Sequence, residues 1–127
     1  MPNPAHVIAV VDDEEINREA LGRLLTVLGY GVELYESAEL FLVALGDSKA
    51  RCLLVDINLG GISGIELARG LATAGFRRPI IFMTASADER IRKRALDAGC
   101  VAFLPKPFHP TALAQALVAA GLRDSID

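Results

Sequence analysis

The stretch VIAVVDD, residues 7–13, decides the fold, because a short apolar run ends there in two carboxylates. A continuous run of five residues rich in valine predicts a strand that is covered on both faces, as in a parallel sheet. Three further apolar runs end in the same way, at Asp56, at Thr84 and shortly before Lys106. In an open parallel sheet, ligands bind at the carboxyl ends of the strands, so these polar groups would converge on one site.

Strand and helix patterns alternate along the rest of the chain. Parallel strands need crossover connections, and right-handed helical crossovers are the default. The weakest strand pattern, around Val32, alternates apolar and polar residues and therefore belongs at an edge. The sequence thus predicts an α/β, flavodoxin-like (βα)5 fold, with a five-stranded parallel sheet of order 2-1-3-4-5 and helices on both faces. We expect strands over 7–11, 32–35, 52–55, 80–83 and 101–104, and helices over 14–29, 64–74, 88–98 and 110–121, with one more helix after Ser37.

Length and charge limit the class of protein. A chain of 127 residues can bury a full core, and we expect residues 1–127 to form a single domain. A net charge of −3 gives no electrostatic case for nucleic-acid binding. No apolar run approaches the ~18 residues of a membrane span, and the first residues lack the pattern of a secretory signal. We therefore expect a cytoplasmic protein that binds neither nucleic acid nor membrane.

Two adjacent carboxylates, Asp12 and Asp13, follow the first predicted strand. They repel one another unless a cation lies between them, and hard cations such as Mg²⁺ take oxygen ligands. An alternative is that the acidic residues 12–15 only place negative charge at a helix N-terminus, which is favourable by itself. The two interpretations are compatible with one another.

Asp56 is the candidate nucleophile. Its carboxylate is ionised near neutral pH and needs no base to attack phosphorus. Because one anion then attacks another, the site needs positive charge, which Mg²⁺ and Lys106 would supply. The alternative is that Asp56 only caps the glycine-rich loop that follows it, residues 58–64.

Thr84 and Lys106 complete the candidate site. The Thr84 hydroxyl can donate to a phosphoryl oxygen; the alternative, capping the next helix, suits Ser86 better. Lys106 lies between two prolines that fix the backbone, so we expect its ammonium to be a positioned cation. The Lys106–Pro107 bond is a candidate for the cis form, because the chain must turn tightly there.

These motifs resemble the receiver domain of bacterial two-component response regulators, the family of the chemotaxis regulator. The likeness extends over essentially the whole chain. It rests on Val11-Asp12-Asp13, Leu54-Val55-Asp56-Ile57-Asn58-Leu59, Gly64, Phe82-Met83-Thr84-Ala85, Ala98-Gly99 and Lys106-Pro107-Phe108. The resemblance implies that Asp56 accepts a phosphoryl group from a sensor histidine kinase or a phosphotransfer protein, and that the chain catalyses only its own phosphorylation and dephosphorylation.

The resemblance also implies the ligands of the metal. Asp13 and Asp56 would bind Mg²⁺ directly, together with the backbone carbonyl of Asn58. Asp12 would act mainly through water. Mn²⁺ is expected to be able to replace Mg²⁺.

A two-state switch is the further implication of the resemblance. Thr84 and Lys106 would hold the phosphoryl oxygens, and Phe103 would be the aromatic residue that moves together with Thr84. The surface formed by the fourth helix, fifth strand and fifth helix would then act on a partner, on an output domain or on a second copy of the chain.

Two other kinds of protein share parts of this pattern. A phosphatase of the haloacid dehalogenase type also forms an aspartyl phosphate, but the general acid of its D-x-D signature corresponds here to Asn58, which cannot donate a carboxylic proton. A flavodoxin-like FMN binder needs a loop rich in Ser, Thr or Gly after the first strand. The four acidic residues at 12–15 would repel its phosphate.

The sequence leaves open what the domain controls. Residues 35–42 are similar to receivers that precede a LuxR-type DNA-binding domain, whereas Asn17-Arg18 resembles hybrid-kinase receivers. The fourth helix is basic on its outer side, and this side can be a solvated face or a partner surface. The basic residues are Arg90, Arg92, Lys93 and Arg94.

Overall fold

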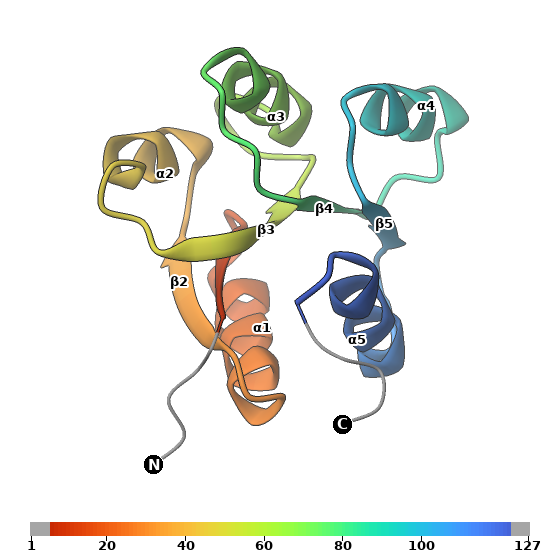
Figure 1. The fold of residues 1–127 in the computed structure, drawn as a ribbon. Helices are drawn as coiled ribbons and strands as arrows, with labels where there is room; N and C mark the ends of the chain where they lie inside the picture. The colour runs from red at the N-terminus through yellow and green to blue at the C-terminus, as the bar shows by residue number, and fades with distance from the viewer. Residues whose placement is uncertain (1–5, 123–127) are drawn as a thin grey trace.

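The computed structural model describes residues 6–122, and strands and helices alternate along them as the sequence predicts (Figure 1). The elements are β1 (Val7–Val11), α1 (Glu15–Val27), β2 (Gly31–Tyr35), α2 (Ala38–Ala44), β3 (Ala50–Asp56), α3 (Gly64–Thr73), β4 (Ile80–Thr84), α4 (Glu89–Asp97), β5 (Ala102–Pro105) and α5 (Pro110–Ala119).

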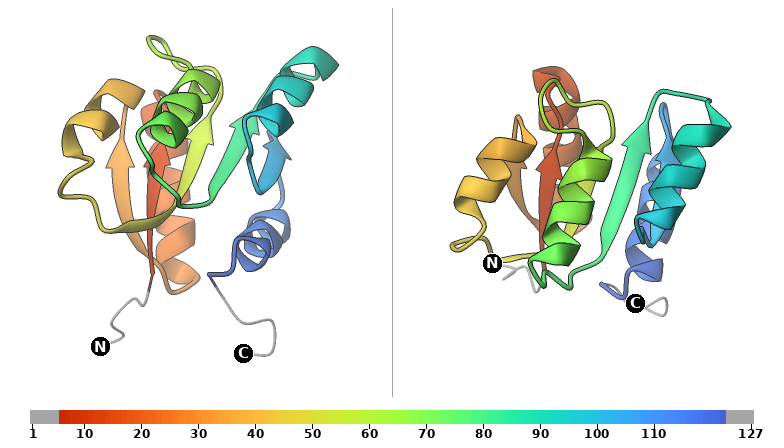
Figure 2. Two further views of the ribbon diagram at one scale, coloured as in Figure 1. Left: turned by 45° about the horizontal axis from the view of Figure 1, so that its top comes forward. Right: turned by 90° about the horizontal axis from the view of Figure 1, so that it is seen from above.

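The five strands form one parallel sheet of order β2-β1-β3-β4-β5. Figure 2 shows that the strand arrows all point the same way, so their carboxyl ends lie along one edge. Helices α1 and α5 cover one face of the sheet, and α2, α3 and α4 cover the other (Figure 1). The predicted flavodoxin-like topology and the edge position of β2 are therefore confirmed.

The sheet separates two apolar clusters, because successive strand residues point to opposite faces. In β1, Ile8 and Val10 pack on the side of α1 and α5, whereas Ala9 and Val11 pack on the side of α2, α3 and α4. All four side chains are fully buried. Burial on both faces explains why β1 is a continuous apolar run instead of an alternating one.

Some details differ from the sequence prediction. The helical spacing of Ile16, Ala20, Leu24 and Leu28 predicts an inner face of this helix. Ile16 is nevertheless 81% exposed, because the first turn of α1 begins at the carboxyl edge of the sheet, and Ala20 is exposed as well. Leu21 and Leu25 form the buried stripe instead. Strand β5 starts at Ala102, one residue later than predicted, and the preceding Val101 is 44% exposed. Strand β3 starts two residues earlier than predicted and extends through Asp56. Within the described range, no helix has the length and apolar character needed to cross a membrane.

Candidate functional site

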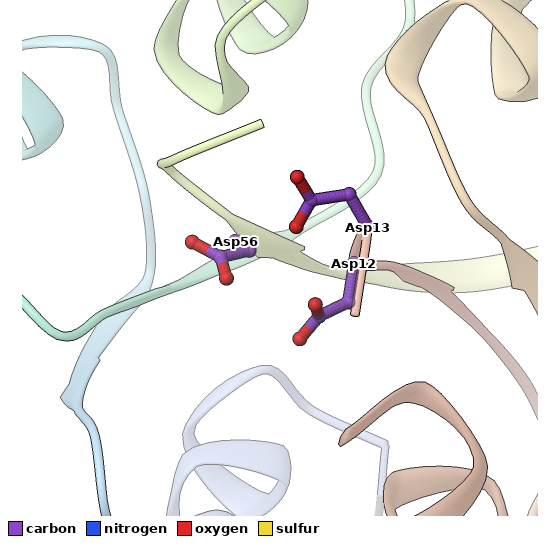
Figure 3. Close-up of side chains that lie close together, drawn as sticks. All are labelled: Asp12, Asp13 and Asp56. Carbon is purple, nitrogen blue, oxygen red and sulfur yellow. The ribbon is translucent and has the colours of Figure 1, made fainter. Parts of the chain in front are cut away.

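Three carboxylates meet at the carboxyl edge of the sheet (Figure 3). Asp12 and Asp13 directly follow β1, and Asp56 is the last residue of the neighbouring strand β3. One oxygen from each of the three side chains lies within 4.8 Å of the others. Asp12 is fully buried and Asp56 is 6% exposed, whereas Asp13 faces solvent. The structure thus brings together the three acidic residues that the sequence suggested as a metal site.

Lys106 supplies positive charge to this cluster from the end of β5. Its Nζ donates hydrogen bonds to Asp56 Oδ2 at 2.7 Å and to Asp12 Oδ2 at 2.9 Å, and its side chain is only 15% exposed. Burial lowers the pKa of the ammonium, but the hydrogen bonds and charges of Asp56 and Asp12 outweigh this effect and raise the pKa above its ordinary value. The prediction of a positioned cation is therefore confirmed.

The backbone around Lys106 is fixed on both sides. The Lys106–Pro107 peptide bond is cis, as the sequence suggested. The Lys106 amide also donates to the carbonyl of Thr84 at 2.7 Å, which ties the turn after β5 to the end of β4. These constraints aim the lysine stem back along the strand ends, toward Asp12 and Asp56.

Asp12 is anchored through its side chain and its backbone. Its Oδ1 accepts a hydrogen bond from the amide of Glu14 at 2.9 Å, directly before the first turn of α1, which has no side-chain cap among the described residues. Its amide donates to the carbonyl of Tyr35 at 3.1 Å. Its carbonyl accepts from Arg18 Nη1 at 2.8 Å. The sequence did not predict the Arg18 contact, because it joins residues six positions apart that share no periodic pattern.

Asp56 has two kinds of partner, one for each oxygen. Oδ1 accepts from the amide of Asn58 at 2.8 Å, so Asp56 does cap the start of the following loop. Oδ2 accepts from Lys106. The capping role and the role as candidate nucleophile are therefore compatible, since they involve different contacts of the same carboxylate.

Gly64 allows α3 to begin directly against the end of β3. A Cβ at this position would lie 2.6 Å from the carbonyl oxygen of Asp56 and 2.9 Å from Ile57 Cα. Both distances are shorter than a van der Waals contact, and both partners are backbone atoms. The helix start is fixed by a capping box, in which Ser63 and Glu66 each bind the other's amide at 3.1 Å.

Thr84 is fully buried at the end of β4, next to Asp56 in the sheet order. Its Oγ1 accepts hydrogen bonds from Asn58 Nδ2 and from the Ser86 amide, each at 3.1 Å. Because both contacts use the oxygen as acceptor, the hydroxyl proton can be donated to another oxygen. The helix cap belongs to Asp88, which accepts from the Arg90 amide, so the suggestion of Ser86 as the cap is wrong.

Phe103 shares one face of the sheet with Thr84. It lies opposite Phe82 in the register of β4 and β5, and Thr84 is two residues beyond Phe82. The Phe103 ring is half-buried against the cluster beneath α3 and α4. The guanidinium carbon of Arg92, on α4, lies 6.0 Å from the ring centroid.

A pocket of about 460 Å³ opens beside Lys106, between α1 and the turn after β5. Its walls are mainly apolar, and its polar lining residues are Glu14, Asn17 and Lys106. It is lined by Glu14, Asn17, Ala20, Leu21, Leu24, Ala85, Lys106, Pro107 and Phe108.

Known proteins with a similar sequence are named as transcriptional or response regulators. The chain is 35% identical over 112 residues to the transcriptional regulatory protein FixJ of Rhizobium meliloti, covering 88% of this chain and 55% of FixJ. It is 36% identical over 120 residues to the response regulator protein TodT of Pseudomonas putida, covering 94% of this chain and 53% of TodT. The chain therefore spans about half the length of these curated relatives.

The fold is also similar to that of a solved structure. The crystal structure of FixJ-N superposes with a TM-score of 0.86 at 34% identity, covering 93% of this chain and 94% of that one. The family model of the response regulator receiver domain matches residues 8–118. This match covers most of the sequence, and the chain accordingly belongs to the receiver domains of two-component response regulators.

Proposed function

We propose that residues 1–127 act as a single phosphoacceptor receiver domain, in which Asp56 takes up a phosphoryl group from a phosphohistidine of a sensor kinase or a phosphotransfer protein. The observation that carries this proposal is the position of Asp56, between two further carboxylates and a lysine ammonium 2.7 Å away. Such a site attracts a cation and an anion together, as phosphoryl transfer requires.

The transfer exchanges one bond to phosphorus for another. A carboxylate oxygen of Asp56 forms a bond to phosphorus while the phosphorus–nitrogen bond of the donor breaks, and the imidazole nitrogen keeps the electron pair. The product is an acyl phosphate on Asp56. Hydrolysis returns the carboxylate and releases inorganic phosphate, so the chain acts only on its own phosphorylation state and is not an enzyme for other substrates.

The donor set of the site fits a hard divalent cation. The acidic cluster offers only oxygen ligands, which suits Mg²⁺, with Mn²⁺ as a substitute. Asp13 and Asp56 would hold the cation with the backbone carbonyl of Asn58, and Asp12 would act mainly through water. When bound, the cation neutralises negative charge on the carboxylates and on the phosphoryl group.

Lys106 and Thr84 are the proposed ligands of the phosphoryl oxygens. Lys106 already lies against Asp56, so its ammonium can follow the new phosphoryl group with a short movement. Thr84 can donate its hydroxyl proton, because its observed contacts occupy only the oxygen. Turning Thr84 toward the phosphoryl group would vacate space under α4, which the Phe103 ring can fill. The surface of α4, β5 and α5 would thereby change toward a partner, an output domain or a second copy.

The pocket beside Lys106 suits the approach of a protein donor. It has apolar walls on α1 and the turn after β5, and its lining residue Lys106 also contacts Asp12 and Asp56. A donor domain could bury an apolar side chain there while its phosphohistidine reaches Asp56.

Phosphorylation by acetyl phosphate tests the assignment. The chain should gain one phosphate by mass spectrometry in the presence of Mg²⁺ or Mn²⁺, and little in EDTA. The gain should disappear in Asp56→Asn and persist in Asp97→Asn, a control that changes an exposed carboxylate at the end of α4. Labelling that survives in Asp56→Asn, or that proceeds fully in EDTA, would refute the proposal.

A further inference from the structure

Arg92 lies over the ring that is proposed to switch. Its guanidinium carbon is 6.0 Å from the centroid of Phe103, at the outer limit of a cation–π contact. Arg92 itself is exposed, and the Phe103 ring is half-buried. The contact therefore joins an exposed cation to a ring that is partly accessible to solvent.

The other basic side chains of α4, all of which the structure describes, do not lie over an aromatic ring. Arg90 is paired with Asp88 at 3.3 Å, and Lys93 and Arg94 are exposed. Among the basic residues of this helix, Arg92 is the one positioned over an aromatic ring. The basic outer side of α4 is thus not uniform, and one of its charges has a specific partner.

We propose that Arg92 is a positioning residue for Phe103, which stabilises the half-exposed ring and so opposes the change that phosphorylation favours. This inference rests on the proposed phosphorylation of Asp56 and concerns the regulation of that same site. Arg92 acts through Phe103 and touches neither the carboxylates nor the position of the phosphoryl group.

The contact with Arg92 depends on the position of the Phe103 ring. Phe103 belongs to the same apolar cluster as Ala95 and Ile91 of α4, so inward movement would take the ring beneath that helix and toward the buried Thr84. Arg92 is on the outer side of the helix, so its guanidinium cannot follow the ring without burying an unpaired charge. The contact is therefore available to only one of the two ring positions.

A contact made in only one state shifts the equilibrium between the two states. A phosphoryl group or its analogue favours the inward position of the ring, whereas the Arg92 contact favours the outward one. The free energy of the Arg92 contact is therefore subtracted from the binding free energy of the analogue. An exposed cation–π contact changes an equilibrium by about two- to fivefold. Removing Arg92 should then raise the affinity for a phosphoryl analogue by up to that factor.

Beryllofluoride with Mg²⁺ is the probe, and calorimetric titration of the whole chain gives its affinity. Arg92→Gln should bind beryllofluoride about two- to fivefold more tightly than Lys93→Gln, which removes the same charge from the same helix without a ring contact. In a Phe103→Leu background, the two substitutions should have equal effects. An equal effect with the ring present, or a difference that persists without the ring, overturns the role of Arg92.

The ring itself provides a second measurement. In the ligand-free protein, Arg92→Gln should shift the NMR signals of Phe103 more than Lys93→Gln does, and equal shifts contradict the inference. Failure of the unsubstituted chain to bind beryllofluoride would refute the phosphoacceptor proposal and the inference that rests on it. Normal binding without a specific effect of Arg92 would refute the inference alone.

Discussion

Replacing Lys106 with methionine, Lys106→Met, removes the ammonium that lies between two buried carboxylates but keeps a side chain of similar length. Asp12 is fully buried and Asp56 is 6% exposed, and both accept hydrogen bonds from Lys106. In the variant these carboxylates face each other and Asp13 with no ammonium to offset their charge. We expect the metal-free protein to be much less stable as a result.

The size of the effect follows from the burial of the three groups. An exposed ion pair is worth roughly 0–1 kcal/mol, whereas removing one partner of a buried pair costs about 3–5 kcal/mol. The site is open on the side of Asp13, so the lower end of this range, about 3 kcal/mol, applies. For a chain of 127 residues, this loss corresponds to a fall in Tm of about 11 °C.

Alkaline pH should reduce the difference between the two proteins. The pKa of Lys106 is raised above its ordinary value of 10.5 in the folded state. The stabilisation by the ammonium is therefore fully present below the ordinary value and is lost as pH rises through the raised one. The advantage of the unsubstituted chain should stay constant near neutral pH and shrink only in strongly alkaline solution.

Calorimetric melts in EDTA and in Mg²⁺ test this reasoning. Mg²⁺ should stabilise Lys106→Met more than the unsubstituted chain, because the cation supplies charge that the lysine no longer provides. Lys93→Met, at an exposed position on α4, should melt like the unsubstituted chain in both solutions. Equal Tm values for Lys106→Met and the unsubstituted chain in EDTA, or equal shifts with Mg²⁺, would show that Lys106 does not balance the carboxylates.

Further expectations concern the backbone, an acid-sensitive contact and the thiols. Gly64→Ala should lower the free energy of unfolding by about 1–3 kcal/mol, because its Cβ would meet backbone atoms. Gly70→Ala, in the same helix but with open space around its Cβ, should raise it by about 0.5–1 kcal/mol; urea titrations showing changes of the same sign would contradict the packing argument. Burial raises the pKa of Glu33, but hydrogen bonds from the loop after α2 outweigh it and lower the pKa below 4.5. The stability difference between the chain and Glu33→Gln should therefore persist above pH 4.5 and shrink as pH falls through the lowered pKa; an unchanged difference at pH 3 would refute this. Burial raises the pKa of the Cys52 thiol to about 12, so iodoacetamide should modify the half-buried Cys100 first, and peptide mass spectrometry showing equal rates in the folded protein would be inconsistent with the structure.

Much of the fold could be predicted from the sequence, because its local signals agree with one another. The run at residues 7–11 is short, apolar throughout and rich in valine, which is typical of a strand buried on both faces. The residues near Val32 alternate between apolar and polar, which indicates a strand that is only half-buried, and β2 indeed lies at the edge of the sheet. Once the sheet order is known, the positions of Asp12 and Asp56 follow, since the ends of neighbouring parallel strands must lie side by side.

Contacts that side chains make with other parts of the chain could not be predicted in this way. Arg18 reaches the Asp12 carbonyl, and Asn58 donates to Thr84 through its side-chain amide. Such contacts depend on the direction of each side chain and on the exact separation of elements, and residue spacing specifies neither. For the same reason the exposure of Ile16 was missed, because helical spacing indicates a face but not how far the sheet extends beneath it.

The hydrogen bonds of the candidate site explain how local chemistry could move distant surfaces. In the ligand-free chain, Lys106 is satisfied by Asp12 and Asp56, and Thr84 is held by Asn58. A phosphoryl group on Asp56 would therefore have to take the Lys106 ammonium over from its existing partners, whereas the Thr84 hydroxyl can donate its proton once the side chain turns. Lys106 follows β5 and Thr84 ends β4, so both residues connect the phosphoryl position to strands other than the one that carries Asp56. The exchange of partners at Lys106 and the turn of Thr84 would thereby link the arrival of the phosphoryl group to β5 and to the start of α4.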